Sequence, residues 1–220
     1  MFTGIVSAVG KITQVQPVEV AYGSSADGAA GLRLRIDVSG TDFDLSRCKL
    51  GDSIAIQGAC MTVVELHEHA FSIDISRESL NRTAGLDQAS EVNLENAMRL
   101  GDTLDGHMVL GHVDGVGQVS AFTPVGESYE LRIVAPVALA KYLAYKGSVT
   151  VNGVSLTVNE VIDLPENAGC EISINLIPHT VQVTTLKNLV AGSSVNLEVD
   201  AIARYVERML SASSMLAADK

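Results

Sequence analysis

One cysteine, one serine and two histidines carry the clearest chemical potential in this 220-residue sequence. Cys60 and Ser155 each stand two residues after a glycine, in runs that are otherwise apolar or contain threonine. A thiol or a hydroxyl can act as a nucleophile when a base lies beside it. His107 and His112 lie in a stretch flanked by glycines, and an imidazole exchanges protons near neutral pH. These four side chains are therefore candidates for a nucleophile and a general base.

Each candidate also has a structural interpretation. A free cysteine often behaves as a small, inert hydrophobe, and serine is common in strands and turns. If residues 107–112 form a strand, the spacing of five places His107 and His112 on opposite faces, so one metal ion would not readily bind both. We expect a structural or surface role for His107 and a functional one for His112. The stretch His67-Glu68-His69 is predicted to be a solvated hairpin tip.

Composition and missing motifs exclude several classes of function. The sequence has no Gly-x-Ser-x-Gly elbow, no P-loop and no Gly-x-Gly-x-x-Gly turn, so neither a hydrolase nor a nucleotide cofactor is indicated. Its three cysteines lack metal-type spacing and are predicted to be free thiols. The net charge of −11 disfavours nucleic acids and anionic membranes as partners. Because no basic-then-apolar leader or apolar run of ~18 residues is present, we expect a cytoplasmic protein.

The elements that position these residues are predicted to be strands. At Leu32–Ile36, apolar and basic side chains alternate with period two, which is typical of a half-buried strand. Similar runs predict an all-β protein, with strands at 53–57, 71–75, 131–134, 148–152, 172–176 and 194–199. The segments Tyr22–Gly31 and Pro165–Gly169 are predicted to be loops.

Only the C-terminal tail has helical spacing. Its apolar residues follow a 3.6-residue period; they are Ile202, Tyr205, Val206, Met209 and Leu210. Asp200, just before them, can cap the helix. We expect this apolar stripe to be buried either on its own domain or on copies of the chain.

The sequence repeats itself. Three blocks recur in the same order roughly one hundred residues apart: 58–63 with 153–158, 92–95 with 195–198, and 4–10 with 111–117. Two tandem copies of one β domain followed by a helix are therefore predicted. Within the matched blocks Cys60 stands opposite Ser155, and Ile5 stands opposite His112. Such twin sites could bind two similar molecules and treat them differently.

These blocks resemble the riboflavin synthase family over nearly the whole chain. The resemblance is carried by Met1–Val6, Gly58–Val63, Gly111–Asp114, Asn152–Thr157, Leu176–Thr180 and Val195–Asp200. It implies two tandem six-stranded Greek-key β-barrels, at residues 1–97 and 98–199, followed by a trimerisation helix at 200–215. It also implies dismutation of two molecules of 6,7-dimethyl-8-ribityllumazine to riboflavin and 5-amino-6-ribitylaminouracil, with no metal and no cofactor. A homotrimer is implied, and association with lumazine synthase is left open.

The resemblance assigns roles residue by residue. His112 is given proton transfer, Cys60 and Ser155 serve as polar or nucleophilic groups, and Asp200 is a nearby carboxylate. In the N-terminal pocket, Thr62 and Ser79 would bind the pteridine edge; its residues are Gly4, Ile5, Val6, Cys60, Met61, Thr62, Asp74, Ile75, Ser76, Arg77, Glu78 and Ser79. The C-terminal pocket would contain Gly111, His112, Val113, Lys146, Ser155, Leu156, Thr157, Ile177, Pro178, His179, Thr180, Val181 and Gln182, with Lys146 near a shared interface.

The sequence departs from the pattern of the riboflavin synthase family at two places. Asp105 stands where the family often has glycine, and Ala59-Cys60-Met61 replaces the more usual Val-Cys-Leu. Neither change removes a polar group from the expected site.

Two rival functions are open to the sequence. One is that of a protein of the same fold that holds a lumazine or a flavin as a light-emission antenna without converting it. The other is a metal enzyme built on His107 and His112.

Overall fold

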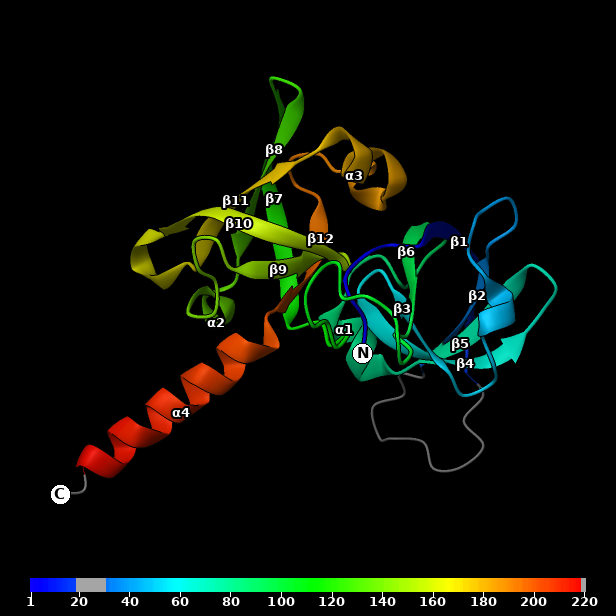
Figure 1. The fold of residues 1–220 in the computed structure, drawn as a ribbon, viewed down its shortest axis with the longest axis horizontal. Helices are drawn as coiled ribbons and strands as arrows, with labels where there is room; N and C mark the ends of the chain where they lie inside the picture. The colour runs from blue at the N-terminus through cyan, green and yellow to red at the C-terminus, as the bar shows by residue number, and fades with distance from the viewer. Residues whose placement is uncertain (19–30, 219–220) are drawn as a thin grey trace.

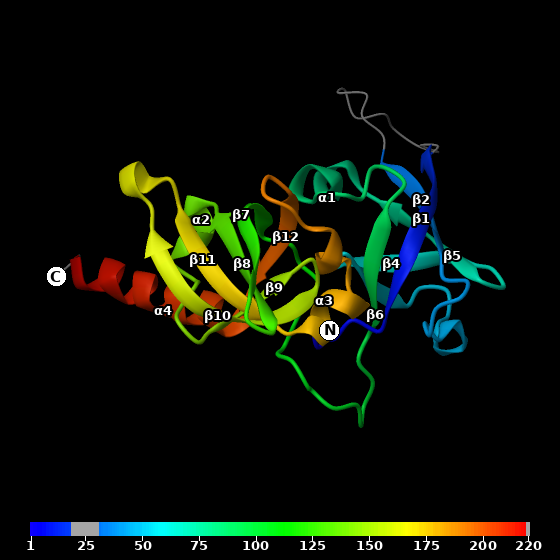
Figure 2. The same ribbon diagram turned by 90° about the horizontal axis from the view of Figure 1, so that it is seen from above.

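The computed structural model describes residues 1–18 and 31–218. Two β-barrels lie side by side, and a long C-terminal helix projects away from the second barrel (Figures 1 and 2). The fold class expected from the sequence is confirmed. Of the predicted loop Tyr22–Gly31, only Gly31 lies within the described residues.

The two barrels are built to the same plan. In each, six antiparallel strands close in the chain order 1-2-5-4-3-6. The N-terminal barrel contains β1 (Ala8–Pro17), β2 (Leu32–Asp37), β3 (Ser53–Ile56), β4 (Ala59–Leu66), β5 (Ala70–Ile75) and β6 (Glu91–Asn96). The C-terminal barrel contains β7 (Gly115–Val125), β8 (Ser128–Ala135), β9 (Ser148–Val151), β10 (Val154–Asp163), β11 (Cys170–Leu176) and β12 (Ser194–Val199).

Irregularities in the strands repeat as well. The register shifts between Val63 and Glu65 in β4, and between Val158 and Glu160 in β10. A bulge of this kind bends its strand, as a small barrel requires. The matching positions follow from the sequence repeat and confirm that the two barrels are structural twins.

The period-two pattern separates the inside of each barrel from the outside. On β2, Leu34 and Ile36 are fully buried in the first core. Arg33 points outward and forms ion pairs with Asp74 of β5 and Glu65 of β4. All seven predicted strand runs lie on strands, except that Gln57 and Asn152 fall just beyond them.

Gln57 and Asn152 form the turns that join β3 to β4 and β9 to β10. Both have positive φ, as do the glycines that follow them, which is the backbone that a tight two-residue hairpin requires. The two turns meet where the barrels touch. A Cβ atom on Gly58 would lie 2.7 Å from the amide nitrogen of Gly153, so only glycine fits there.

Short helices join the strands. Ser76 caps α1 through its side chain. The helical segments are η1 (Leu45–Arg47), α1 (Arg77–Arg82), α2 (Val137–Ala140), η2 (Pro165–Asn167), α3 (Pro178–Val183) and η3 (Thr185–Asn188). The predicted hairpin tip at His67–His69 is confirmed, because it lies between β4 and β5.

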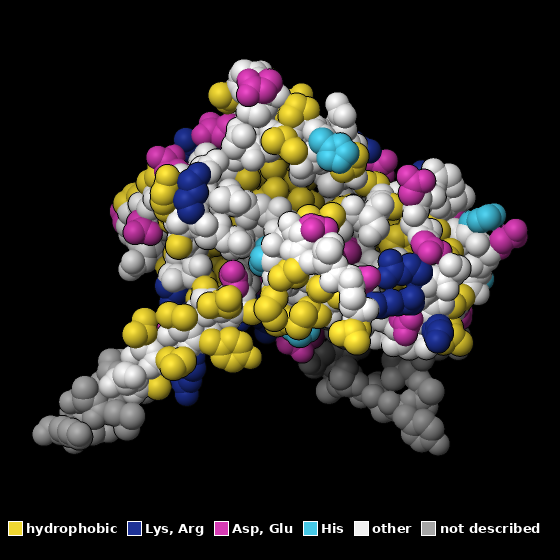
Figure 3. Space-filling model, in the orientation of Figure 1, with side chains coloured by type: hydrophobic (Ala, Val, Ile, Leu, Met, Phe, Trp, Pro, Cys, Tyr) yellow, Lys and Arg dark blue, Asp and Glu magenta, His cyan; other side chains and the backbone are white. Residues whose placement is uncertain are grey.

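Helix α4 (Ala201–Ala218) carries its apolar stripe in solvent. Asp200 accepts a hydrogen bond from the Ile202 amide at 2.9 Å, which confirms the predicted cap. Lys141 of the C-terminal barrel holds the polar side of the helix through Glu207 at 2.6 Å. The stripe is at least half exposed, and Figure 3 shows hydrophobic side chains along the helix; they are Ile202, Tyr205, Val206, Met209 and Leu210. Within one chain, therefore, this stripe is not buried on its own domain.

None of the helices in the described part of the chain combines the length and hydropathy needed to cross a membrane.

Candidate functional site

The N-terminal segment and the segment between the barrels cross over one another. Phe2 and Val109 are paired by hydrogen bonds in both directions, at 2.7 and 3.1 Å, and both are buried. Beyond this pair, Val6 packs against the core of the C-terminal barrel and Val113 packs against the core of the N-terminal barrel. Each barrel is therefore covered by a segment that precedes the other.

The crossing brings each segment into contact with the strand of the opposite barrel that carries Cys60 or Ser155. These strands are β4 in the N-terminal barrel and β10 in the C-terminal barrel. The Ser155 amide donates to the Gly4 carbonyl at 2.7 Å, and the Cys60 amide donates to the Gly111 carbonyl at 2.7 Å. The approach is close, since a Cβ on Gly4 would lie 2.6 Å from that of Ser155 and a Cβ on Gly111 would lie 2.7 Å from that of Cys60. Both glycines also have positive φ. We name the two places the Cys60 site and the Ser155 site.

The Cys60 site is a cavity of about 160 Å³ between β4, α1 and the crossing segment. His112 lines it together with the thiol. The full lining is Ala59, Cys60, Met61, Ser79, Arg82, Thr83, Gly111, His112 and Val113. Cys60 is half-buried, whereas Cys48 and Cys170 are buried, and all three are free thiols as predicted.

The Ser155 site holds the other histidine. Nδ1 of His107 lies 2.7 Å from Oγ of Ser155, within hydrogen-bond distance. His107 is buried, and burial lowers the pKa of its imidazole, an effect that the charge of Asp200 opposes. The ring is therefore held neutral near pH 7 and can accept a proton. A Cβ on Gly106 would lie 2.1 Å from the Thr3 carbonyl oxygen, so glycine is required beside the pair.

This arrangement differs from the expected distribution of residues. Gly4 and its neighbours lie on the Ser155 site, and Gly111, His112 and Val113 lie on the Cys60 site, so the two segments are exchanged relative to the sequence-based assignment. Residues 105–114 contain one isolated bridge, at Val109, and form no strand. The opposite-face argument therefore does not apply, although the two histidines do occupy different sites.

The remaining residues expected in the N-terminal pocket are dispersed. Met61 and Ile75 belong to the barrel core, and Asp74 is engaged by Arg33. Ser76 caps α1 and contacts Ser79, which lines the Cys60 site. The outward residues are Ile5, Thr62, Ser76, Arg77 and Glu78, all exposed.

The C-terminal set is dispersed in a similar way. Val181 is buried in the barrel core, and Leu156 is partly buried against it. Lys146 lies at the turn before β9, where its ammonium group donates to Asn159 at 2.9 Å. Exposed side chains make up most of the rest: Lys146, Thr157, Ile177, Pro178, His179 and Gln182, with Thr180 half-buried.

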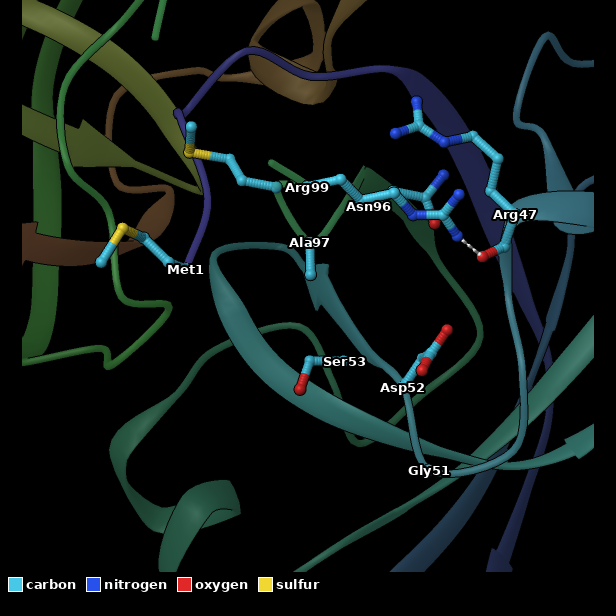
Figure 4. Close-up of a pocket in the computed structure, with 9 residues that line it drawn as sticks. Met1, Arg47, Gly51, Asp52, Ser53, Asn96, Ala97 and Arg99 are labelled. Atoms are coloured by element: carbon cyan, nitrogen blue, oxygen red, sulfur yellow. Dashed lines mark hydrogen bonds between the residues drawn. The ribbon is translucent and has the colours of Figure 1, made fainter. Parts of the chain in front are cut away.

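A larger cavity lies elsewhere on the N-terminal barrel. It measures about 350 Å³ and contains none of the expected site residues. In the view of Figure 4, Arg47 and Arg99 lie on one side of it, and Asp52 and Ser53 lie on the other. Arg99 donates to the Arg47 carbonyl, and Arg47 pairs with Asp102 at 3.2 Å, so both guanidinium groups already have partners within the chain.

The sequence did not indicate that His107 lies beside Ser155, and it did not single out Thr3 or Gly106. A signal was present, because glycines flank the stretch that holds both histidines and glycine permits a close backbone approach. The contact partner could not be read from the sequence, because it depends on how the segments cross.

Comparison with known proteins identifies the family. The model of the lumazine binding domain matches twice, at residues 3–97 and 110–200. The riboflavin synthase of Photobacterium phosphoreum is 42% identical over 214 residues, covering 96% of this chain and 89% of that protein. The riboflavin synthase of Mycobacterium tuberculosis strain H37Rv is 40% identical over 217 residues, covering 96% and 98%. The chain belongs to the riboflavin synthase family.

Riboflavin synthases are transferases, so the chain belongs to a family of enzymes. Solved structures of the same fold include LumP complexed with 6,7-dimethyl-8-(1'-D-ribityl) lumazine, at a TM-score of 0.69 and 25% identity. LumP complexed with riboflavin has a TM-score of 0.71 and 27% identity. Each comparison covers 90% of this chain and 99% of LumP. The riboflavin synthase family therefore shares its double-barrel architecture with a lumazine-binding protein.

Proposed function

We propose that this protein is a riboflavin synthase that converts two molecules of 6,7-dimethyl-8-ribityllumazine into riboflavin and 5-amino-6-ribitylaminouracil. One lumazine gives four carbons to the other, and the two products together contain all atoms of the two substrates. The reaction therefore needs no external oxidant or reductant. The observation that carries the proposal is the twin pair of sites, with a thiol and a hydroxyl at equivalent positions of two matching barrels.

The Ser155 site supplies proton transfer. The methyl group at C7 of the lumazine is acidic, because its conjugate base delocalises into the ring. A neutral imidazole beside a hydroxyl suits removal of that proton, with His107 accepting it directly or through Ser155 Oγ. We therefore assign the base to His107 rather than to His112. Asp200, whose charge acts on His107, would favour the imidazolium that forms.

The Cys60 site takes the second lumazine. Its cavity combines the Cys60 thiol, the Ser79 hydroxyl and the exposed His112 ring. These groups can donate to and accept from the polar edge of a pteridine. Because the groups differ from those at the Ser155 site, the two bound molecules would follow different chemical courses.

Much of the rate enhancement would come from orientation. Holding two bulky rings face to face can contribute ~7–11 kcal/mol in a well-oriented pair. We propose that the exposed α4 stripe packs against the same stripe of two further chains. Burial of large apolar side chains such as Tyr205 and Met209 would drive this trimerisation. In the trimer, the Cys60 site of one chain would face the Ser155 site of another.

Conversion is the direct test. Purified protein is incubated with 6,7-dimethyl-8-ribityllumazine, and absorbance and chromatography follow the appearance of riboflavin. The proposal expects riboflavin to accumulate over many turnovers. Lumazine that is bound but recovered unchanged would instead support an antenna function of the kind considered from the sequence.

A further inference from the structure

Two buried carboxylates stand at equivalent positions of the barrels. Glu95 lies near the end of β6 and Glu198 near the end of β12, and both are almost completely buried. An ionised carboxylate in such a place loses its hydration, at a cost of several kcal/mol unless hydrogen bonds replace the water. The cores of the two barrels are built from apolar side chains, so the presence of two acids needs another reason.

Among the described residues, each of these carboxylates accepts hydrogen bonds from a single crossing segment. Glu95 accepts from the Thr3 amide at 2.6 Å, the Thr3 hydroxyl at 2.8 Å and the Gly4 amide at 2.9 Å. Glu198 accepts from the amides of Leu110, Gly111 and His112, at 2.8, 3.0 and 3.2 Å. A carboxylate that accepts several N–H groups fixes its donors firmly, because such bonds are stronger than neutral ones.

The fixed segments are the ones that cover the opposite barrel. Gly4, held by Glu95 of the N-terminal barrel, contacts Ser155 of the C-terminal barrel. Gly111 and His112, held by Glu198 of the C-terminal barrel, lie on the Cys60 site of the N-terminal barrel. Thr3 also accepts from the His107 amide at 3.1 Å.

The surroundings of the two acids are similar but not equal. Burial raises the pKa of both carboxyl groups, that of Glu198 to about 7. The charge of Asp114, just before β7, adds to the effect at Glu198, and Arg204 of α4 pairs with that aspartate. On β9, the residue paired with Glu198 is the uncharged Thr150.

We propose that Glu95 and Glu198 are positioning residues that act across the joint between the barrels. Glu95 sets the geometry of the Ser155 site, and Glu198 sets the geometry of the Cys60 site. The importance of this for turnover rests on the proposed function, in which those two sites take the two ligands. The positioning itself can be measured without lumazine.

The test uses Glu95→Gln and Glu198→Gln, with the exposed Glu91→Gln at the start of β6 as a matched control. A glutamine keeps the shape but turns an NH2 group toward N–H donors. The reporter for the Cys60 site is the rate at which an aromatic disulfide reagent modifies Cys60, since the other two thiols are buried. The reporter for the Ser155 site is the titration midpoint of the His107 ring, followed by NMR. Circular dichroism checks that each variant is folded.

We expect a crossed result. Glu198→Gln should accelerate Cys60 modification about tenfold, the scale expected when a charge-assisted hydrogen bond is lost, and should leave the His107 midpoint unchanged. Glu95→Gln should raise the His107 midpoint toward its ordinary value, because a loosened cover admits water, and should leave Cys60 modification unchanged. The control should change neither reporter.

Three results would overturn the proposal. Each substitution could change only the reporter of its own barrel, each could change both reporters, or neither could change any reporter. If a glutamine variant does not fold, Glu95→Asp and Glu198→Asp retain the charge and shorten its reach by one methylene. These variants should give the same crossed pattern at smaller size. A protein that binds lumazine without converting it could still give this pattern, so failure of the proposed reaction and failure of the positioning roles are distinguishable.

Discussion

Nδ1 of His107 lies 2.7 Å from Oγ of Ser155, although the two residues come from different segments of the chain and His107 is far from β10 in sequence. The pair forms because the N-terminal segment, the segment between the barrels and β10 are in contact here. Thr3 accepts from the His107 amide, and Gly4 accepts from the Ser155 amide. Because this contact places a neutral base beside a hydroxyl, it supports the proposed proton transfer.

Removal of the base should slow the chemical step. We expect His107→Gln to lower kcat by ~10²- to 10⁴-fold, the range for loss of general base catalysis, with a small change in KM. His69→Gln, at the exposed hairpin tip, is the matched control and should leave kcat unchanged. Steady-state kinetics at saturating lumazine measure both. A kcat for His107→Gln within threefold of wild type would contradict the assignment.

If His107 and Ser155 act as a unit, their substitutions should not be additive. We expect Ser155→Ala to lower kcat strongly, and His107→Gln added to it to lower kcat little further. The double-mutant cycle for kcat measures this coupling. Fully multiplicative losses would mean that the two side chains act independently.

The burial that lowers the pKa of His107 also predicts a pH profile. The ring must be neutral to act as a base, so activity should persist as the pH falls through 6.5 and should be lost only below it. The acid limb of kcat/KM against pH, corrected for stability, measures this. A limb centred above the ordinary histidine pKa would contradict the expected direction.

The raised pKa of Glu198 predicts that the stability of the fold decreases as the pH rises. Its folded pKa of about 7 lies above the unfolded value near 4.5, so Glu198 takes up a proton at a higher pH in the folded protein than in the unfolded chain. Its contribution to the free energy of unfolding should be complete below pH 4.5 and should be lost as the pH rises through 7, by roughly 3 kcal/mol in all. Urea unfolding of wild type and Glu198→Gln from pH 5 to 8 tests this. The wild type should lose stability more steeply with rising pH, and equal slopes would refute the prediction.

Gly111 should not tolerate a side chain. Alanine there would meet Cys60 Cβ at 2.7 Å in addition to adopting a positive φ. Gly126→Ala is the matched control, because that glycine also has positive φ but has open space around it. We expect a loss of about 1 kcal/mol in the free energy of unfolding for the control and at least 1 kcal/mol more for Gly111→Ala. Equal losses would mean that the crossing segment is not tightly packed on β4.

The apolar stripe of α4 should control assembly. We expect Tyr205→Glu together with Met209→Glu to convert a trimer into monomers and to lower turnover with it. Arg208→Glu, outside the stripe, should leave the trimer intact. Sedimentation equilibrium gives the molar mass of each variant. A monomeric wild type that retains full turnover would contradict the proposed assembly.

Much of the fold could be predicted from the sequence because its causes are local. Alternation at Leu32–Ile36 determines a strand face, and the spacing from Ile202 to Leu210 determines a helix stripe. The repeat then predicts that both barrels share one topology, which the strand order confirms. Asp200 as a cap is also a local feature, and it is confirmed.

The partners within each site could not be predicted in the same way. Cys60 and Ser155 were identifiable as equivalent, but which histidine lies beside which residue depends on the crossing of Phe2 with Val109. Two segments of similar sequence can cover their own barrel or the opposite one with the same local propensities. Glu95 and Glu198 were visible as acids within apolar strands, yet their partners are set by the same crossing.

In the proposed reaction two lumazines, one at each site, exchange a four-carbon unit. The most direct measurement is the stoichiometry of the reaction, obtained by quantifying substrate and both products by chromatography throughout the time course. We predict that two lumazines are consumed for each riboflavin, with one 5-amino-6-ribitylaminouracil formed alongside it, and that Ser155→Ala slows both products equally. Recovery of unchanged lumazine, or riboflavin formed without an equal amount of the pyrimidine product, would contradict the proposed dismutation.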